Sequence, residues 1–213
     1  MNQINDPDAL ARDAAVDAAL ATPAAAAPPR RRLTAEDRLP GDPTPRALVE
    51  RVVRVDHAGE YGAQRIYAGQ LAVLGNTRHA PLLRHMKEQE DVHYETFSRL
   101  VGERRVRPTA LLPLWNVAGF ALGAATALLG HRAAMACTVA VEEAIDEHYQ
   151  AQHAALGDDE AELRGHIARF REEELEHRDI GLDNEAELAP AYRLMSAVIK
   201  AGCKAAIAVS ERV

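Results

Sequence analysis

The sequence predicts an all-α fold in which four long helices form a bundle, with a long apolar crossover in the middle and a further amphipathic helix at the end. Three observations indicate this class. Apolar residues recur every three or four positions through most of residues 47–213, which is the period of an α-helix. Aromatic residues make up only 4% of the chain, so alanine, leucine and valine must fill the core. The second half of this region also repeats the pattern of the first.

Composition and charge indicate where the folded domain begins and argue against certain targeting signals and partners. Residues 1–45 are rich in Ala, Pro, Asp and Arg, and their prolines interrupt any helix, so we expect a disordered tail before a domain at residues 46–213. Several aspartates among the first 29 residues fit neither a secretory signal nor an acidic-poor transit peptide. Cys137 and Cys203 form no disulfide framework, which suits a reducing compartment. The net charge of −7 argues against nucleic acid as the main partner.

The four bundle helices are expected at residues 47–74, 80–101, 133–156 and 160–181. The first ends at Gly75-Asn76, and Gly157 interrupts the chain before the fourth, as residues that stop helices do. The inward line of the first helix includes Val53, Glu60 and Tyr67. An ionised glutamate on such a line costs several kcal/mol unless it is paired or binds a metal. Glu60 is therefore a candidate ligand.

The second and fourth helices each carry a glutamate and a histidine three residues apart. Glu90 and His93 lie on one apolar stripe, and Glu174 and His177 lie on another. Residues at this spacing share one face of a helix, as two ligands of one metal must. A single ExxH pair is expected by chance in a chain with 19 Glu and 9 His, so the second copy carries the signal.

An isolated glutamate precedes each pair at nearly the same distance, and a tyrosine follows each of these glutamates by seven residues. Glu60 lies 30 residues before Glu90, and Glu142 lies 32 before Glu174. We choose Glu142 over Glu143 because only Glu142 shares a face with Thr138, Ile145 and Tyr149. The glutamates beside Glu174 are expected on a solvated face; they are Glu172, Glu173 and Glu176.

Residues 108–130 contain no charged side chain and are long enough to span a bilayer. A single crossing would separate Glu60 from Glu142, so we expect either a buried crossover or a segment lying in the membrane interface. Pro113, Gly119 and Gly123 predict a poor straight helix. Arginines flank the segment, as expected for contact with anionic headgroups. The amphipathic helix expected at 190–213 could dock on the bundle or on the same membrane surface.

Glu, ExxH, Glu and ExxH from four helices match the ligand pattern of ferritin-like di-iron and di-manganese proteins. Four carboxylates balance two divalent cations, and oxygen with imidazole ligands suits iron or manganese better than zinc. The bridging carboxylates are Glu60 or Glu90 together with Glu142 or Glu174. Candidates to orient the histidines are Asp56, Asp146 and Asp179. Tyr67 and Tyr149 lie too far from their glutamates to be ligands and could line an access channel.

Several segments resemble the demethoxyubiquinol hydroxylase family of ubiquinone biosynthesis, among them RVDHAGEYGAQRIYAGQLAVL, MKEQEDVHYETF, ACTVAVEEAIDEHYQAQ and EEELEHRDIGLD. The resemblance covers about residues 47–213. It implies a ferritin-like monooxygenase in which two iron ions are held by Glu60, Glu90, His93, Glu142, Glu174 and His177. His148 and Tyr149 match positions beside that centre and become candidate catalytic residues.

The resemblance also implies the substrates and the location. The substrates would be a polyprenyl methoxy-benzoquinol, hydroxylated on its ring, and dioxygen. The protein would lie peripherally on the cytoplasmic face of a bacterial inner membrane rather than a mitochondrial one. A homo-oligomer or a complex of ubiquinone-biosynthesis proteins is compatible with it.

Two other functions fit parts of the pattern. The same six ligands serve ferritin-like ferroxidases, peroxidases and manganese catalases. Manganese in the purified protein, with peroxide consumption and no ring hydroxylation, would favour that class. A non-enzymatic lipid- or quinone-binding scaffold is the other alternative, and it predicts that Glu142→Ala leaves biological activity intact.

Overall fold

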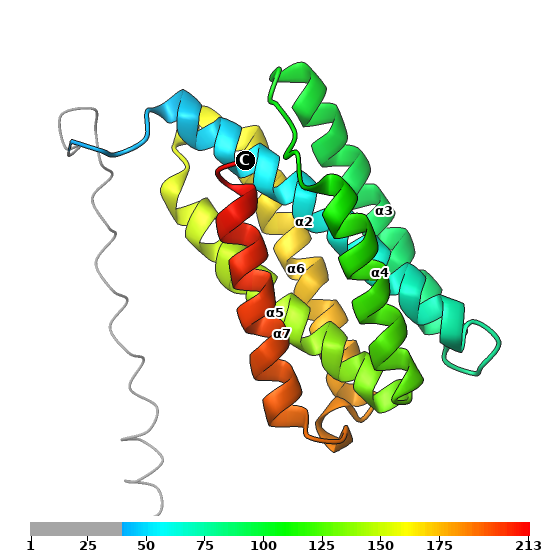
Figure 1. The fold of residues 1–213 in the computed structure, drawn as a ribbon. Coiled ribbons are helices and arrows are strands. Elements are labelled where there is room, and N and C mark those ends of the chain that lie inside the picture. Colours follow the sequence, from blue (N-terminus) through cyan, green and yellow to red (C-terminus); the bar gives the residue numbers. More distant parts are fainter. Residues whose placement is uncertain (1–39) are drawn as a thin grey trace, which may run out of the picture. The chain divides into compact units, whose positions relative to one another are not determined.

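The computed structural model describes residues 40–213, which are helical with no strand among them (Figure 1). The α-helices are α2 (Pro45–Leu74), α3 (Ala80–Glu103), α4 (Leu112–Leu128), α5 (His131–Ala155), α6 (Ala161–Asp183) and α7 (Tyr192–Ser210). Short 3-10 helices, η2 (Asp158–Glu160) and η3 (Ala186–Leu188), precede α6 and α7. The all-α class is confirmed, and the helices begin and end within a few residues of the predicted positions. Most of the predicted tail lies outside the described residues.

Helices α2, α3, α5 and α6 form the bundle, in which α2 packs on α3 and α5 packs on α6 (Figure 1). Apolar residues fill the bundle at both ends. One end contains Leu83, Met86 and Met135, and the other contains Phe97 and Phe170. The stretch of each helix between these two clusters carries the glutamates and histidines singled out from the sequence. The fold thus holds these polar groups midway along the bundle.

The crossover is a continuous helix, α4, which packs along α2. The expectation of a poor straight helix was wrong for two reasons. Pro113 lies in the first turn of α4, where its missing N–H is not needed. Gly119 and Gly123 allow close packing, because a Cβ at Gly119 would come within 2.8 Å of the Gly62 carbonyl oxygen and one at Gly123 would overlap the Ile66 carbonyl. None of the helices in residues 40–213 is both long and apolar enough to cross a bilayer.

The last helix, α7, docks on the bundle along α5. Lys200 pairs with Glu143, and Lys204 Nζ lies 2.7 Å from a carboxylate oxygen of Glu147, so two ion pairs join the helices. Ile199 of α7 is buried against α5. Other apolar residues of the same helix, such as Leu194 at 67% exposure, face solvent. Some apolar residues of α7 therefore pack in the core, and others are exposed to solvent.

Candidate metal centre

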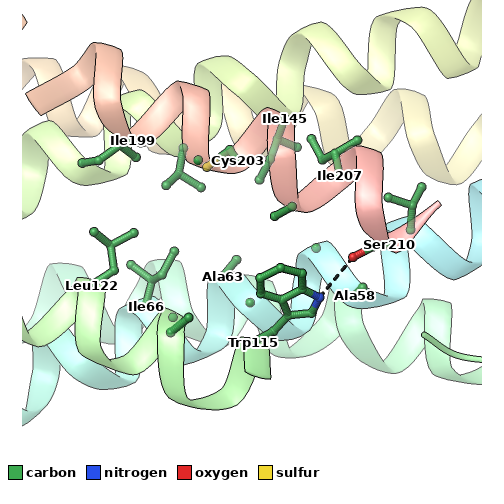
Figure 2. Close-up of a pocket in the computed structure, with 18 of the residues that line it drawn as sticks. Ala58, Ala63, Ile66, Trp115, Leu122, Ile145, Ile199, Cys203, Ile207 and Ser210 are labelled. Atoms are coloured by element: carbon green, nitrogen blue, oxygen red, sulfur yellow. Dashed lines mark hydrogen bonds between the residues drawn. The ribbon is translucent and has the colours of Figure 1, made fainter. Parts of the chain in front are cut away.

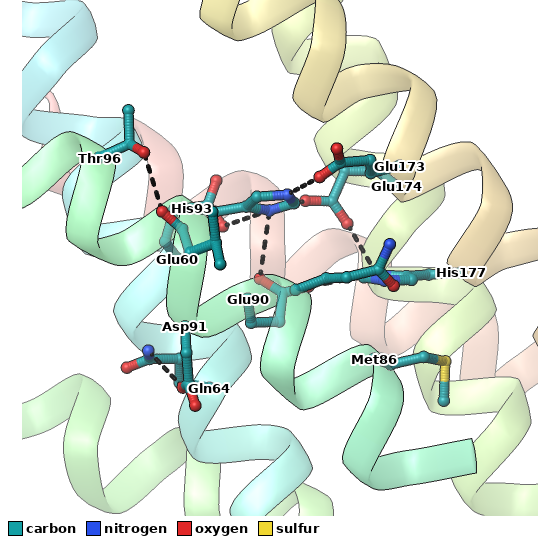
Figure 3. Close-up of polar contacts among 12 residues, drawn as sticks. Glu60, Gln64, Met86, Glu90, Asp91, His93, Thr96, Glu173, Glu174 and His177 are labelled. Carbon is teal, nitrogen blue, oxygen red and sulfur yellow. Dashed lines mark hydrogen bonds and ion pairs between the residues drawn. The ribbon is translucent and has the colours of Figure 1, made fainter.

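Six buried side chains from four helices converge in the middle of the bundle. Figure 3 labels five of them, all but Glu142. They come from α2, α3, α5 and α6, and none is more than 2% exposed; they are Glu60, Glu90, His93, Glu142, Glu174 and His177. The sequence predicted all six positions. They meet because each occupies the inward stripe of its helix, where Leu83, Phe97, Leu163 and Phe170 are also buried.

The six residues form two overlapping groups, each with one candidate ligand atom per residue, and these atoms lie within 4.8 Å of one another. Glu60 and His93 belong to the first group, and Glu142 and His177 belong to the second. Glu90 and Glu174 belong to both. A carboxylate shared by two such groups has the position of a bridge between two ions.

The polar atoms that face the interior of the cluster lack hydrogen-bond partners. Such orphaned atoms occur on all six residues; they are Oε2 of Glu60 and Glu142, both carboxylate oxygens of Glu90 and Glu174, and Nδ1 of His93 and His177. Buried polar groups are nearly always satisfied, and each unsatisfied one costs about 1–3 kcal/mol. Oxygen and imidazole donors aimed at a common point fit a pair of divalent cations.

The electrostatics of the cluster also fit bound cations. Burial, together with repulsion from the neighbouring carboxylates, raises the pKa of Glu90 and of Glu142 well above the usual range. Burial opposes ionisation of Glu174 as well, but the two nearby imidazoles lower its pKa to about 2. Both Nδ1 atoms, of His93 and of His177, lie 3.2 Å from Glu174 oxygens. Four buried carboxylates repel one another unless positive charge lies between them.

The outward nitrogen of each histidine contacts a side chain from the facing helix, and Figure 3 shows this contact for His93 and Glu173. His93 Nε2 lies 2.5 Å from Glu173 Oε2, and His177 Nε2 lies 2.9 Å from Gln89 Oε1. These contacts point the Nδ1 atoms into the cluster. The assignment of Glu173 to a solvated face was therefore wrong, because its carboxylate reaches across to His93.

The three aspartates proposed to orient the histidines have other partners. Asp146 Oδ1 accepts from Arg171 at 2.6 Å, and Asp179 Oδ1 accepts from Arg178. Asp56 accepts from Gln152 Nε2 at 2.6 Å. Asp146 and Asp179 thus form surface ion pairs, and Asp56 makes a buried contact with Gln152 rather than with His93 or His177.

Each of the two tyrosines donates a hydrogen bond to the isolated glutamate of the other half of the bundle. Tyr67 of α2 donates to Glu142 Oε1 at 2.9 Å, and Tyr149 of α5 donates to Glu60 Oε1. Each tyrosine follows one glutamate by seven residues but binds the glutamate of the other half. The equal spacing in the sequence was thus a signal for both tyrosines, although it did not reveal their partners.

His148 lies beside this centre rather than in it. Its Nε2 is 2.7 Å from Gln152 Nε2 and 3.6 Å from Asp56 Oδ1, and its side chain is 16% exposed. Burial raises the pKa of Asp56 to about 6, although the contacts with His148 and Gln152 oppose that rise. The structure therefore brings Tyr149 to the cluster and leaves His148 on its outer side.

An apolar pocket of about 380 Å³ lies beside the cluster, between α2 and α4 on one side and α5 and α7 on the other (Figure 2). Gly59 and Val141 line it and directly precede Glu60 and Glu142 in the chain. At one end Trp115 Nε1 donates to Ser210 Oγ at 3.0 Å. Sequence reasoning missed this pocket because four separate helices supply its lining.

Comparison with known proteins agrees with these features. The family model for "Ubiquinone biosynthesis protein COQ7" matches residues 47–210. A protein of Rhodospirillum rubrum named 3-demethoxyubiquinol 3-hydroxylase is 64% identical over 183 residues, covering 85% of this chain and 86% of its own.

Eukaryotic relatives are similar over the same region. A mouse protein named NADPH-dependent 3-demethoxyubiquinone 3-hydroxylase, mitochondrial, is 60% identical over 171 residues, covering 78% of this chain and 79% of its own. A yeast protein named 5-demethoxyubiquinone hydroxylase, mitochondrial, is 41% identical over 184 residues, with coverage of 78% and 79%. With a family match spanning the whole bundle and relatives this similar, the chain belongs to the demethoxyubiquinol hydroxylase family of ubiquinone biosynthesis.

Proposed function

We propose that this protein is a di-iron, dioxygen-dependent monooxygenase that hydroxylates the ring of a polyprenyl demethoxyubiquinol. The observation that supports it best is the set of orphaned oxygen and nitrogen atoms on six buried residues, all turned toward one another. The names of the relatives supply the substrate. The reaction inserts one oxygen atom of O2 into a ring C–H bond, and two electrons and two protons convert the other oxygen atom to water. By the name of the mouse relative, NADPH is the source of those electrons.

In this proposal Glu90 and Glu174 would help to hold both irons, because they belong to both ligand groups. Glu60 with His93 completes one site, and Glu142 with His177 completes the other. When bound, the iron pair supplies the redox chemistry with dioxygen. The chain positions the ligands: Tyr67 and Tyr149, as hydrogen-bond donors, fix the carboxylates of Glu142 and Glu60.

We assign the apolar pocket to the substrate. A quinol ring there lies against the seam between α2 and α5, with Glu60 and Glu142 one residue from the lining positions Gly59 and Val141. The apolar lining excludes water from the reacting ring. His148 stays a candidate catalytic residue in this proposal, because it is partly exposed and its Nε2 lies 3.6 Å from buried Asp56 Oδ1.

We further propose that α4 and α7 rest on a membrane, at the cytoplasmic face of a bacterial inner membrane. Both helices line the pocket and carry exposed apolar side chains; the most exposed are Leu114, Val117, Leu128, Leu129, Leu194 and Val198. Arg105 and Arg107, both exposed, precede α4, and Arg132, which pairs with Glu185 and is 45% exposed, follows it; these side chains can contact anionic headgroups. A polyprenyl tail can then remain in the lipid while its ring enters between the two helices.

Mass spectrometry of quinones from a strain lacking this gene tests the function. We expect a demethoxy intermediate to accumulate, to disappear when the intact gene is restored, and to persist with a Glu174→Ala version. Normal quinone content in the deletion strain, or full rescue by Glu174→Ala, would contradict the proposal. A Glu172→Gln version, which changes an exposed neighbour on α6, is the matched control and should restore the quinone.

A further inference from the structure

The two halves of the bundle are nearly equivalent around the cluster. Glu60, Glu90 and His93 of the first half correspond to Glu142, Glu174 and His177 of the second. The crosswise hydrogen bonds from Tyr67 and Tyr149 obey the same correspondence. Two metal positions built in this way would have the same ligands and the same tyrosine support.

The correspondence fails at the residue before each ExxH glutamate. That residue is Gln89 in the first half and Glu173 in the second, and each contacts the outward nitrogen of the other half's histidine. An amide oxygen thus faces His177 at 2.9 Å, whereas a carboxylate oxygen faces His93 at 2.5 Å. One imidazole has a neutral partner, and the equivalent imidazole has an anionic one.

This difference changes how strongly each histidine binds a metal ion. A carboxylate that accepts the outward N–H makes a charge-assisted hydrogen bond, and it makes the imidazole a more basic ligand through its other nitrogen. Arg169 Nε lies 2.9 Å from the second oxygen of Glu173. The side chain of Arg169 is 57% exposed, so solvent screens its charge and Glu173 keeps much of its effect on buried His93.

We propose that the two metal positions are unequal, and that the Glu60 and His93 position binds its ion first and more tightly because Glu173 supports His93. Gln89 is the positioning residue of the weaker position, at Glu142 and His177. This inference rests on the proposed function only in assuming that the cluster binds two divalent ions. Its direction follows from residues 89 and 173, the pair of equivalent residues whose side chains contact the outward nitrogens of the two histidines.

Titration of metal-free protein with Co2+, followed by calorimetry and by the visible absorption of bound cobalt, tests the order of binding. The intact protein should bind two ions in two resolved steps. Glu173→Gln should weaken the first step by about 10- to 100-fold, the usual effect of losing such a partner, and bring the two steps together. Gln89→Glu should strengthen the second step to a similar extent and leave the first unchanged.

Glu172→Gln is the matched control, because it removes one charge from the adjacent, exposed position of α6 and should alter neither step. Circular dichroism establishes that each variant is folded. If Glu173→Gln behaves like the control, or weakens only the second step, the inference is wrong while the di-metal site stands. If the intact protein fails to bind two cobalt ions, both the inference and the proposed function fail.

Discussion

Gly62 gives a test in which folding stability and substrate binding should move in opposite directions. It lies inside α2, where glycine weakens a helix, and it lines the apolar pocket. A Cβ placed there meets no neighbouring heavy atom within 4 Å, so packing does not require glycine at this position. Gly62→Ala should therefore fold normally while placing a methyl group in the space assigned to the quinol.

The magnitudes follow from these two effects. Replacing a helix-interior glycine by alanine should raise the free energy of unfolding by about 0.5–1 kcal/mol. For a domain of this size that corresponds to a Tm increase of about 1–4 °C. A methyl group forced against a bound ring costs about 1–3 kcal/mol, which weakens binding by roughly 5- to 150-fold.

Trp115 provides the binding assay because it is the only tryptophan in the chain and lines the pocket. A short-chain methoxy-benzoquinone should quench its fluorescence with saturation, and Gly62→Ala should shift the titration to higher concentration. Gly165→Ala is the matched control: it also lies inside a helix with no neighbour near its Cβ, but outside the pocket lining. Equal affinity in Gly62→Ala and Gly165→Ala would refute the pocket assignment.

Three further predictions concern the metal centre, the pH dependence and the membrane face. Glu90→Ala should abolish binding of both metal ions because Glu90 belongs to both groups, whereas Glu142→Ala should leave one ion; metal analysis showing equal loss in both variants would contradict the bridging assignment. Burial raises the pKa of Asp56 from 3.8 to about 6 on folding. The protonated carboxyl group therefore adds about 3 kcal/mol to the free energy of unfolding below pH 4, and this contribution is lost as the pH rises through 6. In urea unfolding of metal-free protein, Asp56→Asn should gain stability relative to the unaltered chain between pH 4 and 7, and a difference independent of pH would count against this burial effect. Val117→Asp combined with Val198→Asp, both at exposed positions, should reduce co-sedimentation with anionic vesicles at unchanged Tm, and undiminished vesicle binding would exclude this face.

The sequence was sufficient for the features that depend on local periodicity. Glu90 and His93 lie one helical turn apart on a stripe of apolar residues, so the face they share and the burial of that face follow from a single segment. The same reasoning distinguished Glu142 from Glu143: the first is 1% exposed, and the second pairs with Lys200 at the surface of α5. The duplication of the pattern then placed four helices around one centre.

Features that depend on contacts between distant segments could not be predicted in this way. Glu173 and His93 are 80 residues apart, and nothing in the local pattern of α6 distinguishes Glu173 from its exposed neighbours. Gly119 suggested a broken helix when considered alone, and only the closeness of α2 explains why it stands in an intact one. The pocket likewise requires the relative placement of four helices. Single-segment reasoning therefore identified the six residues that converge in the bundle, but not the residues that contact their outward nitrogens.

The central claim is that six residues from four helices hold a pair of iron ions. Anomalous X-ray diffraction at the iron edge, from crystals loaded with ferrous iron without oxygen, tests it most directly. We expect two peaks about 3.5–4 Å apart, one beside Glu60 and His93 and one beside Glu142 and His177, with Glu90 and Glu174 between them. A single peak, or peaks away from these residues, would contradict the account.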